Sequence, residues 1–106
     1  KRLEARDFSR VRIKFLIHFV AVTTPIPINT LKDYSDNYNA AWKYFGQFFE
    51  EQGVKYLNFN TQYFKAFTHD LKAYTDYDGH MNGDAAKAYS KVLAQVLEKT
   101  DQKNEE

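Results

Sequence analysis

Hydrophobic side chains occupy both faces of the stretch from Arg12 to Val22. With alternate residues pointing to opposite sides, one face carries Ile13, Phe15, Ile17 and Phe19, and the other carries Leu16, Val20 and Val22. This pattern predicts a central strand of a parallel sheet with helices on both faces. His18 falls on the second face, where an imidazole bonded to backbone is a better explanation than a catalytic group.

The stretch from Thr23 to Asn29 contains two prolines and cannot continue the strand, because proline has no N–H to donate. We expect a loop at the carboxyl end of the first strand. Ligands bind at that end of open α/β sheets, so the loop is a candidate to line a site. A rigid connector is the simpler interpretation.

Steps of three and four residues between apolar positions predict a helix from Lys32 to Gln52, with Asp33 as its N-cap and Gly53 just after its end. The apolar stripe consists of Tyr34, Tyr38, Ala41, Trp42, Phe45, Phe48 and Phe49. Such a stripe favours core packing over a ligand site, and we interpret Trp42 as structural.

A second strand is predicted from Val54 to Phe59. Strand, helix and strand with short joins form a right-handed crossover, so the two strands should be parallel. The connection from Asn60 to His80 has no sustained periodicity, although Thr61 to Phe67 could form a turn or two of helix. Connections of this length are more often functional than not.

The last predicted helix runs from Gly83 to Lys99, with Asn82 as its N-cap and Asp84 in its first turn. Its expected buried face consists of Ala86, Tyr89, Val92, Leu93, Val96 and Leu97. Residues 100–106 are predicted to form a flexible polar tail.

The whole chain is then one α/β unit, with a core at 11–99. Because two parallel strands make a thin sheet, we expect it to pack against an upstream half of the domain or a second copy.

Composition excludes several classes of function. Lys and Arg alternate with Asp and Glu at a net charge of +1, so no basic stripe predicts binding of nucleic acid. The absence of cysteine excludes disulfides, cysteine nucleophiles and thiolate metal sites, and leaves the compartment open. The longest apolar run, Ile13 to Val22, is interrupted by Lys14 and His18 and is too short for a membrane helix. No cofactor is expected.

The stretch from Asp76 to Asp84 carries the candidate chemistry. A hydrolase base is a histidine whose second ring nitrogen is fixed by an acceptor, usually a carboxylate. In an extended segment Asp78 would lie on the same side as His80, with Asp76 one step further along. Gly79 allows the backbone to bend between them. The N-terminus of the following helix should disfavour imidazolium and so keep His80 neutral.

Three other interpretations of this region remain open. Alternating polar residues, Asp76, Asp78, His80, Asn82 and Asp84, suggest a calcium turn, but Met81 and Lys87 stand where an EF-hand needs Gly and Glu; no metal is therefore expected. A binding module without catalytic activity could stack sugars on nearby aromatic residues, namely Tyr63, Phe64, Phe67, Tyr74 and Tyr77. Finally, Asp78 and His80 could merely form a turn that caps the helix.

The stretch 78–83, Asp-Gly-His-Met-Asn-Gly, resembles the closing block of SGNH (GDSL-like) hydrolases, in which an Asp and a His precede a last helix that starts with small residues. The order of elements from Ile13 to Leu97 is similar to the C-terminal half of that fold. The resemblance implies a partial three-layer α/β/α, flavodoxin-like fold and a Ser–His–Asp site for ester hydrolysis or for acyl transfer on cell-envelope polysaccharides. It therefore also implies a location outside the cytoplasm or at the cell envelope, although the sequence itself does not exclude the cytoplasm.

Two departures from the family pattern shape the prediction. The commonest family spacing is Asp-x-x-His, but Tyr77 stands three residues before His80. Asp-x-His also occurs in the alginate acetyltransferase branch, so the acid is assigned to Asp78, with Asp76 in reserve. The nucleophile block is absent: Ser9 has no strand ahead of it, and Ser35 and Ser90 fall inside predicted helices. We expect these 106 residues to be inactive alone.

Overall fold

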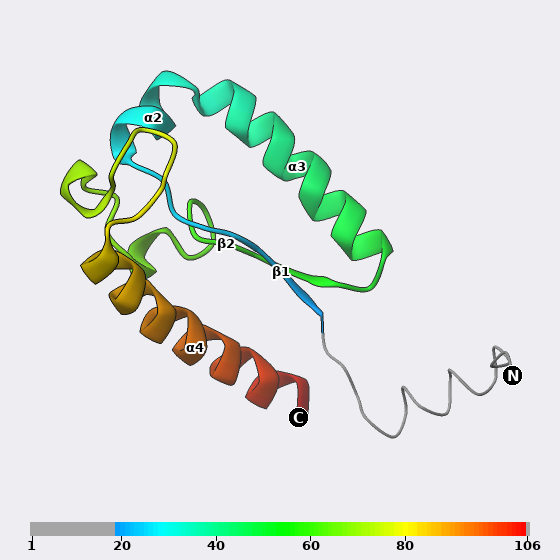
Figure 1. The fold of residues 1–106 in the computed structure, drawn as a ribbon. Coiled ribbons are helices and arrows are strands. Elements are labelled where there is room, and N and C mark those ends of the chain that lie inside the picture. The colour runs from blue at the N-terminus through cyan, green and yellow to red at the C-terminus, as the bar shows by residue number, and fades with distance from the viewer. Residues whose placement is uncertain (1–18, 106) are drawn as a thin grey trace, which may run out of the picture.

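The computed structural model describes residues 19–105, with side chains placed as far as Thr100. The described chain is a small α/β unit with a two-stranded parallel sheet and three α-helices (Figure 1). In chain order the elements are β1 (Val20–Thr23), α2 (Ile28–Asp33), α3 (Ser35–Glu51), β2 (Lys55–Asn58), the 3₁₀ turns η1 (Phe64–Ala66) and η2 (Leu71–Ala73), and α4 (Gly83–Glu105). Ser9, His18 and the expected strand residues before Phe19 lie outside the described residues.

The parallel pairing of β1 and β2 confirms the predicted crossover. Val22 pairs with Leu57, and Ala21 pairs with Tyr56. The side of the sheet that carries Val20, Val22 and Leu57 packs against α4. The other side faces α3, and Figure 1 shows the two helices on opposite sides of the strands. On that side the hydroxyls of Thr23 and Tyr56 share a hydrogen bond.

The core lies between the sheet and α4. Its buried members are Leu57, Phe59 and Tyr89, and the rings of Phe59 and Tyr89 meet edge to face with centroids 5.1 Å apart. The partly buried residues around them are Val20, Val22, Tyr63, Phe67, Met81, Val92, Leu93, Val96 and Leu97. The predicted buried face of α4 is confirmed except at Ala86, which is exposed while Ala85 is buried. The helix also continues past its expected end at Lys99 to Glu105.

The hydroxyl of Tyr89 is buried and has no hydrogen-bond partner among the described residues. Burial raises the pKa of Tyr89 to about 12. Since a buried hydroxyl without a partner costs desolvation free energy, we expect Tyr89→Phe to raise the free energy of unfolding by about 1 kcal/mol in a urea titration. Tyr74→Phe is the matched control: the Tyr74 hydroxyl donates to Thr68 O at 2.8 Å, so its loss should lower stability by about 1 kcal/mol. A loss of stability in Tyr89→Phe would contradict the prediction.

The helix predicted from Lys32 to Gln52 is in fact two helices. It begins earlier, because the buried loop ends at Pro27, which lies at the N-cap of α2. Asp33 is the last residue of α2 and not an N-cap, since Tyr34 leaves helical geometry (φ −125°, ψ 28°) before α3 starts. At the far end the prediction is confirmed: Gly53 has φ +69°, the left-handed conformation expected after a helix.

The aromatic stripe of α3 does not form core as predicted, because no residue of α3 is fully buried. The helix contacts the sheet at Tyr56, through the ring of Phe49 and the backbone at Gly46. Two strands are narrower than the stripe, so Phe45 and Phe48 remain exposed at its edge. Trp42 is half-buried and stacks on Tyr38 with ring centroids 5.3 Å apart.

The loop between β1 and α2 is a rigid connector, as the simpler interpretation expected. Pro25, Ile26 and Pro27 are buried. Asn60, just after β2, accepts from Ile26 N and donates to Thr24 O, both at 2.9 Å. This contact fixes the loop at the carboxyl ends of both strands.

His69, in the connection between β2 and α4, holds the same loop from a second direction. Its Nδ1 lies 2.8 Å from Ile26 O, its Nε2 lies 3.0 Å from Phe64 O, and its ring stacks on Phe64. Its backbone carbonyl accepts from Ile28 N at 2.8 Å. The long connection is therefore ordered by contacts with the β1–α2 loop.

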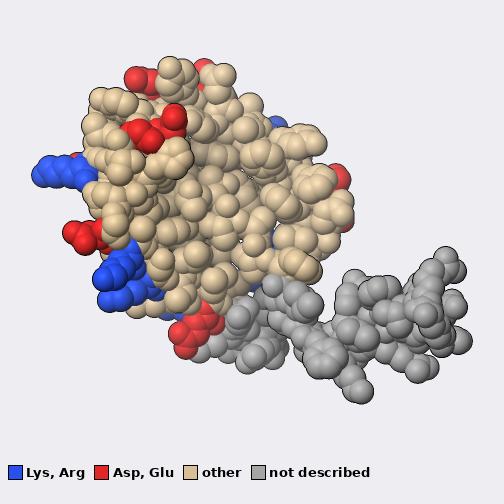
Figure 2. Space-filling view, in the orientation of Figure 1, with Lys and Arg blue, Asp and Glu red and all other residues tan. Residues whose placement is uncertain are grey.

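One face of the molecule has few charged residues at its centre. On the face drawn in Figure 2, Lys, Arg, Asp and Glu lie around the rim and uncharged residues fill the centre. No helix in residues 19–105 is long and apolar enough to cross a membrane.

Candidate active site

A closed loop between η2 and α4 carries the candidate residues. The two ends of the loop are joined by a β-bridge between Tyr74 and Met81 and by a hydrogen bond from Thr75 N to His80 O at 2.6 Å. Asn82 adds two hydrogen bonds between the same ends, from its backbone N to Ala73 O at 3.0 Å and from its side-chain amide to Lys72 O at 2.8 Å. The loop is thus held mainly by backbone groups at both of its ends.

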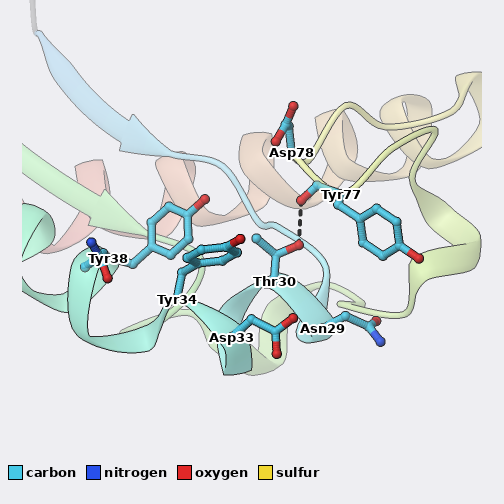
Figure 3. A pocket seen from close by; sticks show the side chains of 8 residues that line it. Asn29, Thr30, Asp33, Tyr34, Tyr38, Tyr77 and Asp78 are labelled. Atoms are coloured by element: carbon cyan, nitrogen blue, oxygen red, sulfur yellow. Dashed lines mark hydrogen bonds between the residues drawn. The ribbon is translucent and has the colours of Figure 1, made fainter.

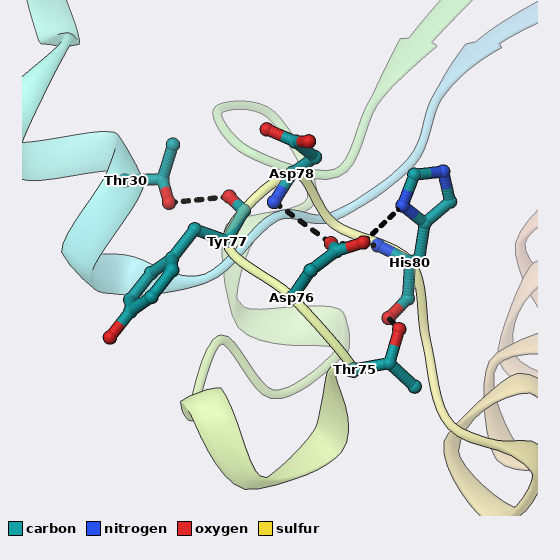
Figure 4. Close-up of polar contacts among 6 residues, drawn as sticks. All are labelled: Thr30, Thr75, Asp76, Tyr77, Asp78 and His80. Atoms are coloured by element: carbon teal, nitrogen blue, oxygen red, sulfur yellow. Dashed lines mark hydrogen bonds and ion pairs between the residues drawn. The ribbon is translucent and has the colours of Figure 1, made fainter.

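Asp76 and His80 form a hydrogen-bonded pair within this loop (Figure 4). Asp76 Oδ2 lies 2.6 Å from His80 Nδ1. The other oxygen, Oδ1, accepts from Asp78 N at 2.9 Å and from His80 N at 3.2 Å. One carboxylate therefore fixes both the turn of the loop and the orientation of the imidazole. His80 Nε2 has no partner among the described residues, and the side chain is 74% exposed.

Asp78, which the sequence favoured as the partner of His80, does not contact the imidazole. The expectation assumed an extended segment in which residues two apart share a side. Instead the chain turns: Asp76 accepts from Asp78 N, and Gly79 adopts φ +101°. The turn points the Asp78 carboxylate away from His80 (Figure 4) and brings in Asp76, the reserve candidate.

Gly79 also allows the loop to approach the β1–α2 connector closely. A Cβ added at Gly79 would lie 2.7 Å from Ile26 Cγ2, so no larger residue fits without movement. On the other flank, Thr30 Oγ1 in α2 donates to Tyr77 O at 2.6 Å. These contacts hold the loop against the connector and the helix that follow the carboxyl end of β1.

The electrostatics of the pair differ from the sequence-based expectation. The hydrogen bond that His80 donates to Asp76 and the negative charge of that carboxylate raise the pKa of His80, and the same bond lowers the pKa of Asp76. The helix N-terminus was expected to keep His80 neutral, but Asn82 Oδ1 caps that terminus by accepting from Ala85 N at 2.9 Å. The carboxylate at 2.6 Å outweighs the capped helix end. His80 is thus a stronger base than a free histidine.

A cleft of about 700 Å³ lies on the other side of the same loop (Figure 3). Its lining residues are Asn29, Thr30, Asp33, Tyr34, Asn37, Tyr38, Tyr77 and Asp78. Of the aromatic residues that the sequence placed near a site, only Tyr77 is among them. Tyr63 and Phe67 pack on the core and Tyr74 is buried. The cleft is lined by α2, by the start of α3 and by a loop that is distant in the sequence. No local sequence pattern predicts that these segments lie together.

The described residues also bear on the requirements of a metal site and of a serine nucleophile. Among the described residues, no three His, Asp or Glu side chains are grouped so that they could hold a metal ion. Neither of the two described serines bonds to His80, since Ser90 Oγ donates to Ala86 O within α4 and Ser35 is the first residue of α3. Ser9 lies outside the described residues.

Comparison of the chain with protein-family models, curated proteins and solved structures finds no match. Function is therefore inferred from the residues and their geometry.

Proposed function

We propose that this chain supplies the Asp–His part of a Ser–His–Asp site in an SGNH-like hydrolase or acyltransferase that acts on ester bonds. The observation that carries the proposal is the 2.6 Å contact between Asp76 Oδ2 and His80 Nδ1, with Nε2 left open. An imidazole fixed through one nitrogen and free at the other is the arrangement that a general base requires.

In this proposal His80 Nε2 takes the proton of a serine hydroxyl as the serine oxygen attacks the ester carbonyl. The tetrahedral intermediate then expels the alcohol, which receives the proton from His80, and an acyl-serine remains. Water or an acceptor hydroxyl repeats the sequence and releases the acyl group. Asp76 holds the ring and stabilises the imidazolium that forms twice in the cycle. The raised pKa of His80 has the direction that this role needs.

The fold supports the same proposal. The loop that carries the pair packs on the connector after the carboxyl end of β1, the end at which open α/β sheets bind ligands. Helices cover both faces of the two strands, as in one part of a three-layer domain. The uncharged centre of the face in Figure 2 and the exposed aromatic residues of α3 suit packing against an upstream half, which would also bring the nucleophile. A cell-envelope location remains part of the proposal.

The pH dependence of the reaction tests the role of Asp76. Only the neutral form of His80 accepts a proton, so kcat/KM should rise with pH through the pKa of His80, which the pair holds above its ordinary value of 6.5. Asp76→Asn keeps an oxygen that can accept from the loop N–H groups but removes the charge. We therefore expect Asp76→Asn to move the midpoint of the acid limb to lower pH and to reduce kcat/KM by about 10²-fold or more.

The measurement is a pH–rate profile of the full-length protein with a short-chain acyl ester. Asp84→Asn is the matched control, since it removes an exposed carboxylate from the first turn of α4. It should leave both the midpoint and kcat/KM close to those of the parent. If the midpoint moved in Asp78→Asn and stayed fixed in Asp76→Asn, Asp78 and not Asp76 would be the carboxylate that orients His80.

A further inference from the structure

The cleft beside the Asp76–His80 loop has the residues of a ligand site. Its walls come from α2, from the start of α3, and from Tyr77 and Asp78 of the loop. The bond from Thr30 Oγ1 to Tyr77 O joins the two walls (Figure 3). From this geometry we infer that the cleft binds a neutral carbohydrate chain.

Tyrosine rings provide the surfaces for stacking. The side chains of Tyr34 and Tyr77 are exposed, at 58% and 61%, although each lies on a fixed piece of backbone. The third ring, that of Tyr38, is held in place by stacking on Trp42. Rigid aromatic rings with a hydroxyl offer large contact area at low entropic cost, and the apolar C–H faces of sugar rings are suitable partners for them.

Polar side chains surround the rings and are free to bind. The side chains of Asn29, Asp33, Asn37 and Asp78 line the cleft, and none has a hydrogen-bond partner among the described residues. Amides donate and accept, and carboxylates accept from hydroxyl groups. Such a combination of aromatic faces and unpaired planar polar groups suits a ligand with many hydroxyls.

The charge of the cleft selects among carbohydrates. Two of the lining residues, Asp33 and Asp78, are acidic, and none of those described is Lys, Arg or His. Carboxylates repel a like charge at close range, so a chain of uronic acids or a phosphorylated ligand is disfavoured. A neutral glycan carries no such penalty. Binding here is independent of proton transfer at His80, but the shared loop would hold the glycan next to that residue.

Isothermal titration calorimetry of the full-length protein tests the inference with four probes: cellotriose, triacetylchitotriose, trigalacturonate and choline chloride. We expect at least one neutral trisaccharide to bind with a Kd on the order of 1 mM, and trigalacturonate to bind at least about tenfold more weakly. Tyr34→Ala and Tyr77→Ala should each weaken binding about fivefold or more. The matched control is Tyr44→Ala, which removes an equally exposed tyrosine of α3 outside the cleft and should change the Kd less than about twofold.

Binding that persists in His80→Ala would support a glycan site whether or not the proposed hydrolase chemistry is correct. The inference is overturned if neither neutral trisaccharide binds at concentrations of about 20 mM. It is equally overturned if trigalacturonate binds as tightly as the neutral chains, if choline binds more tightly than either, or if Tyr34→Ala and Tyr44→Ala behave alike.

Discussion

Replacing His80 with alanine is expected to lower kcat/KM for a short-chain ester by about 10⁴-fold in the full-length protein. The imidazole is the only group in the described loop with a fixed nitrogen on one side and an open nitrogen on the other. Without it, neither the nucleophile nor the leaving alcohol has a proton carrier. KM should change much less than kcat, because the removed group acts on the transition state and not on substrate binding.

Steady-state kinetics of the purified variant measure this effect, with circular dichroism to verify that the fold is intact. His80 is mostly exposed, so its loss should leave stability nearly unchanged. Lys87→Ala is the control: it removes another exposed side chain, in α4, and should retain parental activity. An unchanged kcat/KM in His80→Ala would remove the basis for the proposed hydrolase.

Replacing Phe59 with alanine is expected to lower the free energy of unfolding by about 4 kcal/mol. Phe59 is completely buried, and its ring contacts Tyr63 at 5.5 Å and Tyr89 at 5.1 Å between centroids. Truncation would leave a cavity where the end of β2 meets α4, and the surrounding rings cannot collapse fully into it.

Urea titration of the parent and the variant measures the difference. Tyr77→Ala is the matched control, because Tyr77 lies on the loop before α4 with 61% of its surface exposed. Its truncation should cost less than about 1 kcal/mol. Equal losses in the two variants would show that the core does not centre on Phe59.

Local patterns were sufficient to predict much of the fold. The short stretch from Val54 that follows the turn at Gly53 located β2, and the spacing of Tyr89, Val92 and Val96 located the buried face of α4. Glycine and asparagine marked helix ends correctly, because Gly53 can adopt positive φ and Asn82 can cap a free N–H. These signals act within a few residues of chain, which is why the sequence alone carries them.

The features that the sequence did not predict have a different physical origin. The early start of α2 coincides with a contact from a distant residue, His69, whose backbone carbonyl accepts from Ile28 N. The exposure of the α3 stripe follows from the width of the sheet beneath it. The choice of Asp76 over Asp78 depended on a turn that also requires the close approach of Gly79 to Ile26. Contacts between distant segments decide each of these features, and the spacing of residues along the chain does not encode them.

The way in which Asp76 holds its loop has an evolutionary consequence. The bonds that it accepts within the turn come from backbone N–H groups of residues 78 and 80, so neither depends on the side chain at position 77 or 78. Those two positions can therefore change identity while the Asp76–His80 geometry persists. Mutation of Tyr77 and Asp78, which line the cleft, is expected to change which ligand binds while the Asp76–His80 pair stays intact. A directed library at these two codons is the natural starting point for altering specificity.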